Sequence, residues 1–356
     1  MPKSVYSEKF VNAILNEEND PDIKHLCFTL GDISICKPWV KGIPKAKGPK
    51  FLKALKAVFW IRKQIKFYNV QKIYIHYFSF PFMVLVLASG LINRSSWVLW
   101  GGDLYDNQNC LKRNLKEKLR FFLEKLFLKR IYSICSLLPG DYKLACEKYG
   151  ISPIYENVFY PNPVNFDLLD EIQDVKKVAI KRRVLIGNSA TPTNYHMDFF
   201  RKVQGSELQS NSIEIMCPLS YGDSDYGIRV AEKGKEVFPS FHPLFDLLNE
   251  KQYAQFLNTI DVAVMNHQRQ QGLGNIIALL YRGKKVYLRK DCPVFFYLSG
   301  LGIKIFNVEK LYTQTANEIF SFEQEFKENN RKIVSMKFSE KESIRLWRKS
   351  FDQIPR

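Results

Sequence analysis

Two kinds of segment alternate along most of this chain: short apolar segments with the composition of β-strands, and longer segments whose apolar residues recur at helical spacing. In the first half, the predicted strands lie at residues 25–30, 72–78, 96–100 and 133–138. The predicted helices lie at residues 51–67, 81–90, 111–132 and 141–150. Parallel strands need crossover connections, which are usually helices, so this alternation is typical of a parallel sheet covered by helices. The sequence therefore predicts an α/β fold.

The same alternation returns in the second half, after a polar and charged segment. Predicted strands lie at residues 183–186, 213–217, 261–265, 285–288 and 303–306. Predicted helices lie near 194–203, 225–232, 247–259, 273–282 and 293–298, and an amphipathic pair follows at about 308–335 and 339–352. A chain of 356 residues suits two domains. We predict an N-terminal domain at 1–165, a linker at 166–181, a C-terminal domain at 182–335 and a terminal helix at 336–356.

The chain carries a formal net charge of +17, and no Asp or Glu lies between Asp32 and Asp103. Such an excess of cations indicates a polyanionic partner: nucleic acid, anionic lipid or a phosphate-bearing substrate. Two basic stretches with aromatic residues, at 50–67 and 111–130, have the composition of helices that lie on an anionic membrane surface. Nucleic-acid binding is the competing interpretation, and a solvated basic face on helices that pack on the sheet is the plain structural one.

Seven scattered cysteines without a Cys-x-x-Cys spacing fit a reducing cytoplasm and argue against a disulfide framework or a structural zinc site. The longest apolar run, residues 78–92, is interrupted by Pro81 and Gly90 and is too short for a spanning helix of about 20 residues. The first residues contain no apolar signal core. We therefore expect a cytoplasmic protein that is soluble or peripheral to a membrane.

A glycine-containing segment from Arg269 to Asn275 follows the predicted strand at 261–265 and opens an apolar helix. Backbone amides at such a helix start favour a diphosphate, and an arginine adds positive charge. The segment lacks the Lys-Ser/Thr of a P-loop and the full G-x-G-x-x-G of nicotinamide-binding folds, so a nucleotide-sugar diphosphate fits better. A solvated loop is the alternative. The predicted diphosphate contacts are Arg269, Gln270, Gly272, Gly274 and Asn275.

A second small and polar turn, Gly187-Asn188-Ser189, follows the predicted strand at 183–186 and precedes a helix. Open α/β sheets bind ligands at the carboxyl ends of their strands, where small residues let a phosphate or nucleoside approach the backbone. An ordinary strand-to-helix turn is the alternative. We predict that these three residues line the donor pocket and that Tyr221 contacts or stacks on the base. Asp223-Ser224-Asp225 has a metal-binding spacing but begins a predicted helix, so we expect neither a metal nor a cofactor.

In the first half, the segment from Trp100 to Tyr105 (Trp-Gly-Gly-Asp-Leu-Tyr) ends a predicted strand. Asp103 is our first candidate for a general base that deprotonates an acceptor hydroxyl, and a helix-capping role is its alternative. His76, at the end of the strand at 72–78, is the second candidate, against the alternative of a satisfied core histidine. The predicted acceptor contacts are Gly101, Gly102 and Tyr105.

Taken together, these motifs resemble a known family. The segments at 100–105, 187–189 with Asn194 and His196, 217–222 and 269–274 occur in the same order in the TDP-N-acetylfucosamine:lipid II N-acetylfucosaminyltransferase family (4-alpha-L-fucosyltransferase type). The similarity extends from about residue 76 to about residue 298. It implies a GT-B glycosyltransferase fold, with two Rossmann-like domains that face a central cleft and C-terminal helices that cross back to the first domain.

The resemblance also implies an activity. It is inverting, metal-independent transfer of a sugar, such as the deoxy-amino sugar N-acetylfucosamine, from a nucleotide diphosphate, TDP, to a polyprenyl-diphosphate-linked glycan. Such enzymes act in assembly of enterobacterial common antigen, a bacterial surface polysaccharide like O-antigen. The implied partners are a nucleotide-sugar donor, a lipid-linked acceptor and the anionic cytoplasmic face of the inner membrane, and no nucleic acid. The lysine-rich segment at 37–66 and the Ala-Thr-Pro-Thr after Ser189 have no match in the family pattern, which leaves another donor sugar or acceptor open.

Overall fold

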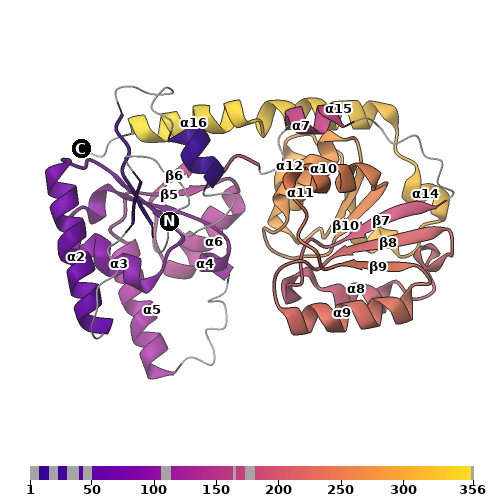
Figure 1. Cartoon of the computed structure of the whole chain (residues 1–356), viewed down its shortest axis with the longest axis horizontal. Helices are drawn as coiled ribbons and strands as arrows, with labels where there is room; N and C mark the ends of the chain where they lie inside the picture. The colour runs from indigo at the N-terminus through magenta and orange to yellow at the C-terminus, as the bar shows by residue number, and fades with distance from the viewer. Residues whose placement is uncertain are drawn as a thin grey trace. The chain divides into compact units, whose positions relative to one another are not determined.

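The structure is a computed structural model of the chain, and it describes residues 8–15, 23–29, 40–42, 50–105, 114–162, 166–172 and 181–353 (Figure 1). The chain divides into two compact units. Unit 1 contains Met1–Pro161 together with Glu340–Arg356, and unit 2 contains Asn162–Ser339.

Unit 1 is built on a four-stranded parallel sheet whose spatial order, β3-β4-β5-β6, follows the sequence order. The strands are β3 (Ile73–His76), β4 (Ser95–Val98), β5 (Ser133–Ser136) and β6 (Ile154–Asn157), and a separate parallel pair is β1 (Cys27–Thr29) with β2 (Val40–Gly42). The helices are η1 (Phe10–Ile14), α2 (Lys50–Phe67), α3 (Phe80–Ser89), η3 (Ile92–Arg94), α4 (Gly102–Tyr105), α5 (Leu115–Leu128) and α6 (Pro139–Tyr149). The predicted helices and strands of this half are thus confirmed over the described residues, and residues 111–113 of the predicted helix at 111–132 lie outside them. The sequence analysis missed the strands β2 and β6.

The last helix, α16 (Glu340–Asp352), belongs to unit 1, which confirms the expected return of the C-terminus to the first domain. Trp347 of α16 is fully buried, and its indole Nε1 donates to the Phe159 carbonyl at 2.9 Å. Trp347 packs with Phe10 of η1 in the core on one side of the unit 1 sheet. On the other side, α3, α5 and α6 enclose a second core around Trp97 and Ile134.

Unit 2 is a six-stranded parallel sheet in the order β12-β11-β10-β7-β8-β9. Its strands are β7 (Arg182–Ile186), β8 (Ile213–Pro218), β9 (Phe241–Leu244), β10 (Val262–Met265), β11 (Lys285–Leu288) and β12 (Phe306–Asn307). The chain starts in the middle at β7, adds β8 and β9 on one side, and then returns to add β10, β11 and β12 on the other. The direction of growth therefore reverses between β7 and β10, and such a switch point is where open α/β sheets bind ligands.

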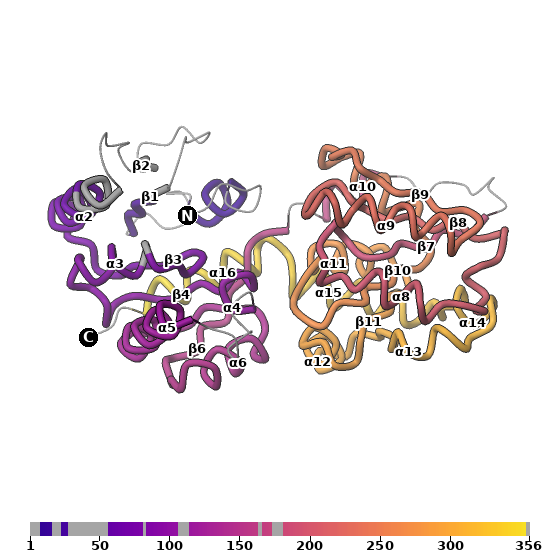
Figure 2. Tube along the Cα trace, turned by 90° about the horizontal axis from the view of Figure 1, so that it is seen from below, coloured from indigo at the N-terminus to yellow at the C-terminus, as the bar shows by residue number. Residues whose placement is uncertain are grey.

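Helices cover both faces of the unit 2 sheet. They are α7 (Phe166–Glu171), η5 (Pro192–Asn194), α8 (His196–Lys202), η6 (Glu207–Gln209), α9 (Ser224–Val237), α10 (Glu250–Thr259), α11 (Leu273–Tyr281), α12 (Pro293–Gly300), α13 (Val308–Leu311), α14 (Ala316–Phe320) and α15 (Gln324–Lys337). In Figure 1, α8 and α9 cover one face and α10 and α11 the other. Helices α11 and α15 lie side by side, as Figure 2 also shows.

The structure differs from the sequence prediction at three places in unit 2. The predicted helix at about 308–335 is divided into α13, α14 and α15. Residues 166–171, predicted as linker, form α7, because Leu169 is fully buried and the Tyr281 hydroxyl donates to the Asp170 carboxylate at 2.7 Å. Strand β9 escaped prediction because Pro243 interrupts it, and Pro is tolerated only at a sheet edge, where β9 lies. Short or edge elements carry the weakest periodic signal.

We expect the buried ion pair between Lys72 and Glu156 to be a major contribution to the attachment of α16. Both side chains are almost inaccessible, their charged atoms lie 3.0 Å apart, and Lys72 Nζ also donates to the Ser350 carbonyl of α16 at 3.0 Å. Lys72→Met leaves the carboxylate buried without its cation, so the free energy of unfolding should fall by about 3–5 kcal/mol. Chemical denaturation measures this, and the double variant Lys72→Met/Glu156→Gln should regain a large part of the loss. A double variant no more stable than the single one would contradict this role of the pair.

Candidate functional site

The loops that follow β7 and β10 meet at the switch point of unit 2. Asn188, in the loop after β7, accepts a hydrogen bond at its Oδ1 from Gln271 Nε2 at 3.0 Å. Its Nδ2 donates to the Tyr221 hydroxyl at 2.7 Å, and Tyr221 lies in the loop after β8. One amide side chain therefore joins three loops, which brings together the three groups of residues that the sequence predicts for the donor.

At two glycines in these loops, a side chain would meet neighbouring atoms, and the backbone also has a positive φ. Gly187 has φ +64°, and a Cβ there would lie 2.6 Å from His196 Nε2. Gly272 has φ +59°, and a Cβ there would lie 3.1 Å from Asn188 Cγ. Left-handed backbone and crowding both exclude larger residues. Gly272 therefore brings the β10 loop against Asn188, and Gly187 leaves room for His196 within the connection from β7 to α8.

The β10 loop ends at the N-terminus of α11, with Gly272 as the N-cap and no acidic residue in the first turn. Arg269, Gln270, Gly274 and Asn275 are all half-buried, so each retains accessible surface. Gln271, which the sequence analysis did not single out, accepts hydrogen bonds from Thr193 Oγ1 at 2.6 Å and Arg269 Nε at 3.5 Å. The helix N-terminus and the guanidinium are together suited to an anion of the size of a diphosphate.

Buried polar atoms without a partner gather at the same edge. Among the described residues, Asn194 Oδ1, His196 Nε2, Asn266 Oδ1 and His267 Nε2 have no hydrogen-bond partner. Burial lowers the pKa of His196 to about 4 and that of His267 to about 4, so both rings are neutral at neutral pH. An unsatisfied buried polar group costs about 1–3 kcal/mol. Four of them beside β7 and β10 indicate a place where a polar ligand or ordered water completes the site.

At the carboxyl edge of the unit 1 sheet, Asp103 connects three segments. Its Oδ2 accepts hydrogen bonds from the Phe78 amide and from the Trp97 indole, each at 2.8 Å. Its Oδ1 accepts from the Trp100 amide at 3.0 Å. Burial raises the pKa of Asp103, and these hydrogen bonds oppose that rise. The carboxylate is buried and is engaged by residues that precede it in the chain, so these contacts support a structural role, but not that of a cap on the helix that follows.

His76 is half-buried at the end of β3. Its Nδ1 is hydrogen-bonded to the Tyr160 hydroxyl, which accepts a second hydrogen bond from Trp100 Nε1 at 2.7 Å. Burial lowers the pKa of His76 to about 3, so the ring is neutral and only weakly basic. Gly101, with φ +80°, is buried and Gly102 is half-buried where α4 begins.

Tyr105 contacts Asp141, a residue at this edge that the sequence analysis did not identify as a candidate. Its hydroxyl donates to Asp141 Oδ1 at 2.6 Å, and among the described residues Asp141 Oδ2 is buried without a partner. Burial, with the nearby Asp103 as a lesser cause, raises the pKa of Asp141 to about 6. Asp141 follows Pro139-Gly140 at the start of α6, where an acid has the appearance of an ordinary helix-capping residue. A raised pKa close to neutral pH is what proton transfer requires.

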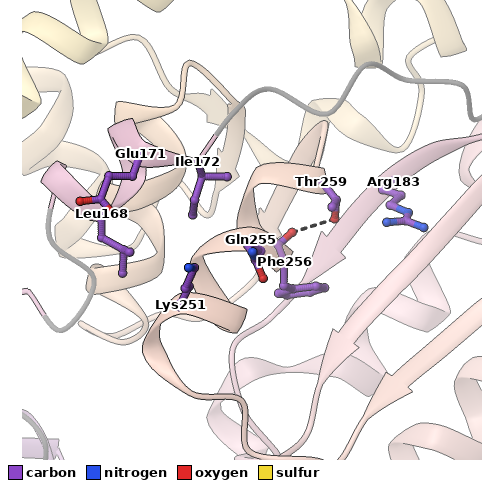
Figure 3. Close-up of a pocket in the computed structure, with 8 residues that line it drawn as sticks. All are labelled: Leu168, Glu171, Ile172, Arg183, Lys251, Gln255, Phe256 and Thr259. Atoms are coloured by element: carbon purple, nitrogen blue, oxygen red, sulfur yellow. Dashed lines mark hydrogen bonds between the residues drawn. The ribbon is translucent and has the colours of Figure 1, made fainter.

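A pocket of about 600 Å³ lies elsewhere in unit 2 (Figure 3). It is lined by Leu168, Glu171, Ile172, Arg183, Lys251, Gln255, Phe256 and Thr259. These residues come from α7, α10 and the amino end of β7, which is the sheet edge opposite to the donor loops. The pocket is therefore separate from the switch point.

Two further observations concern the described residues only. No three His, Cys, Asp or Glu side chains lie together in an arrangement that could hold a metal ion. No helix among them is both long and apolar enough to cross a membrane.

The sequence matches the profile of a family described as "4-alpha-L-fucosyltransferase glycosyl transferase group 56" over residues 56–350. The fold is similar to that of a glycosyltransferase from Rickettsia africae ESF-5, with a TM-score of 0.65 and 15% identity over 88% of this chain and 85% of that one. WaaG, a glycosyltransferase involved in lipopolysaccharide biosynthesis, has a TM-score of 0.61 and 9% identity over 99% of this chain and 97% of its own.

A third similar structure is the sucrose-phosphate synthase of Thermosynechococcus elongatus. Its TM-score is 0.64, with 11% identity over 92% of this chain and 88% of the other. At such identities the likeness concerns the fold, and it confirms the expected GT-B architecture of two parallel α/β sheets.

The contacts of Asp103 predict the effect of Asp103→Asn. An amide keeps one acceptor oxygen and directs its NH2 group towards amide or indole donors, so the free energy of unfolding should fall by about 1–3 kcal/mol. Urea denaturation measures the loss, with the exposed Asp167→Asn as the control, which should stay within about 0.5 kcal/mol of wild type. Asp103→Asn with unchanged stability but no turnover would instead support Asp103 as the general base.

The pKa of Asp141 predicts how stability depends on pH. The ordinary pKa of 3.8 is raised to about 6, so the folded chain binds more protons than the unfolded chain, and stability falls as pH rises through that window. Asp141→Asn removes this loss, so above pH 6 it should be more stable than wild type, by up to about 3 kcal/mol. Denaturation curves below and above the window test this, with Tyr105→Phe as a control that keeps the carboxyl group. Identical pH dependence in Asp141→Asn and wild type would refute the raised pKa.

Proposed function

This chain belongs to the 4-alpha-L-fucosyltransferase family, glycosyl transferase group 56, and is therefore a glycosyltransferase; from that premise we propose its donor, acceptor and chemistry. The donor is a nucleotide-diphosphate sugar, TDP linked to a deoxy-amino sugar such as N-acetylfucosamine. The acceptor is a glycan on a polyprenyl diphosphate at the cytoplasmic face of the bacterial inner membrane, in surface polysaccharide assembly. Another donor sugar or acceptor of the same classes is the alternative.

The observation that carries the donor assignment is the bridge made by Asn188 between the loops after β7, β8 and β10. It places Gly187, Asn188 and Ser189 opposite the β10 loop at the switch point. The diphosphate lies over Gly272 and Gly274, where the free amides of α11 and the Arg269 guanidinium neutralise its charge. Gln270 and Asn275 donate to its remaining oxygens.

Tyr221 is suited to the nucleoside end of the donor. Its hydroxyl is held by Asn188, yet 55% of the residue is exposed, so a face of the ring remains accessible. An aromatic ring in a fixed position can stack on any base, and the selection of the base needs additional polar contacts. We infer that Tyr221 stacks on the base and that Ser189 is close to the ribose or phosphate.

The proposed reaction is a single displacement with inversion. The acceptor hydroxyl oxygen forms a bond to the anomeric carbon, the bond from that carbon to the donor phosphate breaks, and the nucleoside diphosphate leaves with the electron pair. The acceptor proton must go to a base. Gly101 and Gly102 leave space for the acceptor, and the Tyr105 hydroxyl contacts the reacting hydroxyl, taking its proton as the Tyr105 proton moves to Asp141.

The sequence alone makes Asp103 and His76 the candidates for the base. Their hydrogen bonds lead us to assign positioning roles to both: Asp103 holds the loop at 100–105 against β3, and His76 supports it through Tyr160 and Trp100. A test is the pH profile of kcat/KM. Asp141→Asn should lose the limb that titrates near pH 6 while the protein remains folded. If Asp141→Asn retains this limb, a residue other than Asp141 is the base.

We expect Arg269→Ala to weaken TDP binding by about 10–150-fold, because a charge-assisted hydrogen bond contributes about 1.5–3 kcal/mol. Titration calorimetry with TDP measures the affinity. Arg201→Ala is the matched control, since Arg201 is exposed on α8 of the same unit and pairs with the nearby Asp198 at 2.6 Å. Unchanged TDP affinity in Arg269→Ala would count against the diphosphate assignment.

A thermal-shift panel of nucleoside diphosphates separates the donor alternatives, because a ligand that binds the folded state raises the Tm. TDP should give the largest shift. If no nucleotide shifts the Tm and the chain binds duplex DNA with a steep salt dependence, the basic nucleic-acid-binding alternative is favoured.

A further inference from the structure

Helix α5 of unit 1 presents an apolar face to solvent. Exposed apolar residues occur along it at Leu115, Leu119, Phe122, Leu123 and Leu126, and the exposed fraction reaches 85% at Leu115. At about 100° per residue, these five side chains fall within an arc of about 100° on the helix. They therefore form one continuous row, which we call the outer stripe.

The outer stripe is not the face that packs in the core. Glu124, Phe127 and Leu128 are the buried residues of α5, and Phe121 packs beside them against the unit 1 core. By helical position, Phe121, Glu124 and Leu128 lie on the side opposite to the outer stripe, and Phe127 lies between that side and Leu123. A surface helix normally has one apolar face, towards the core, and a polar face towards water. The solvent-facing side of α5 is therefore apolar too, in addition to the side that packs in the core.

The exposed end of α5 is stabilised by its own cap. The Asn114 side chain accepts from the Glu117 amide at 2.9 Å, and the Glu117 carboxylate accepts from the Asn114 amide at 3.1 Å, which is a complete capping box. All residues from 114 to 120 are exposed. Figure 1 shows this part of α5 extending past the unit 1 sheet. The capping box thus stabilises an exposed helix start, which carries two of the five stripe residues, Leu115 and Leu119.

Positive charge flanks the outer stripe on both sides. By helical position, Lys116 lies along one side and Lys118 along the other. Lys129 and Arg130 follow directly after the last residue of α5, and all four are exposed. The two acidic residues of the helix, Glu117 and Glu124, lie on the side opposite to the outer stripe, and Glu124 is paired with Arg120 at 2.8 Å. Negative charge is therefore absent from the stripe and its margins within α5.

The neighbouring helices α2 and α3 also expose apolar side chains. Helix α3 packs between α2 and α5 and exposes Val84 and Leu87. Helix α2 contains no acidic residue and exposes Phe59 and Phe67, at 69% and 76%. Exposed apolar side chains of this size, bordered by cations, mark an interaction surface.

We propose that the outer stripe of α5 docks into an anionic lipid bilayer, with its Leu and Phe side chains among the acyl chains and the flanking Lys and Arg at the lipid phosphates. The charge pattern selects this occupant, because an interfacial helix combines an apolar face with cations at its borders. The inference deepens the proposed function, since a lipid-linked acceptor would be met at this surface. Adsorption to the bilayer does not itself require any substrate.

The test is sedimentation of the full chain with vesicles of phosphatidylglycerol and phosphatidylcholine in equal parts. The variant Leu115→Ser/Leu119→Ser/Phe122→Ser/Leu126→Ser should bind at least about tenfold more weakly than wild type, because it removes four large apolar groups. The matched control is Ile228→Ser/Leu247→Ser/Phe296→Ser/Met336→Ser, which changes four exposed apolar residues of unit 2 and should bind as wild type does.

A second variant, Lys116→Gln/Lys118→Gln/Lys129→Gln/Arg130→Gln, keeps the stripe and removes its flanking charge. It should lose affinity for the anionic vesicles and show a weaker dependence on salt than wild type. Wild-type vesicle binding by both variants would overturn the proposal. So would a wild-type chain that ignores vesicles but forms a dimer that the stripe variant abolishes, since the occupant would then be a second copy.

The donor site gives an independent readout. TDP affinity by calorimetry should be unchanged in the stripe variant, because the donor loops lie in unit 2. A denaturation curve like that of wild type reports that unit 1 of the variant is folded. Vesicle binding without TDP binding in the wild-type chain would defeat the proposed donor and leave the docking surface standing. Retained TDP binding with no vesicle binding would overturn the docking surface and leave the proposed donor standing.

Discussion

The edge of unit 2 at which we propose that the donor binds depends on the side-chain amide of Asn188. It donates to Tyr221 and accepts from Gln271, so the loops after three different strands are fixed to one another. Gly272, with φ +59°, lies close to the Asn188 side chain, and a Cβ there would be 3.1 Å from Asn188 Cγ. An amide is suited to this position because it supplies a donor and an acceptor at once. The parallel sheet brings the loops to one edge, and this group sets their spacing, which a rigid diphosphate site requires.

At the carboxyl edge of the unit 1 sheet, the two buried carboxyl groups of Asp103 and Asp141 differ in how the protein engages them. Asp103 is buried and accepts hydrogen bonds from Phe78, Trp97 and Trp100. We therefore assign it the role of holding the loop at 100–105. Asp141 is equally buried but has one oxygen without a partner among the described residues, and its pKa is raised to about 6. Keeping such a group costs stability at neutral pH. Perturbed carboxyl groups of this kind concentrate where proton transfer takes place.

Much of this was predictable from the sequence, for identifiable reasons. Buried parallel strands are near-continuous apolar runs, so β4, β5, β7 and β10 were predicted, and the small polar turns after them indicated the donor edge. The roles of Gln271 and Asp141 were not predictable, because they rest on contacts with Asn188 and Tyr105 from distant segments. The sequence also did not show that the outer stripe of α5 faces solvent. Periodicity shows that a helix has apolar faces, but not which of them meets the core.

The central claim is that a nucleotide sugar binds where the β7 and β10 loops meet. Hydrogen–deuterium exchange of the full chain, with and without TDP, tests it most directly, because it reports the binding position without requiring the acceptor. The account predicts slower exchange at residues 187–190, 221 and 269–276, and no change along α5. Protection confined to the pocket between α7 and α10, at residues 168–172 and 251–259, or no protection at all, would contradict it.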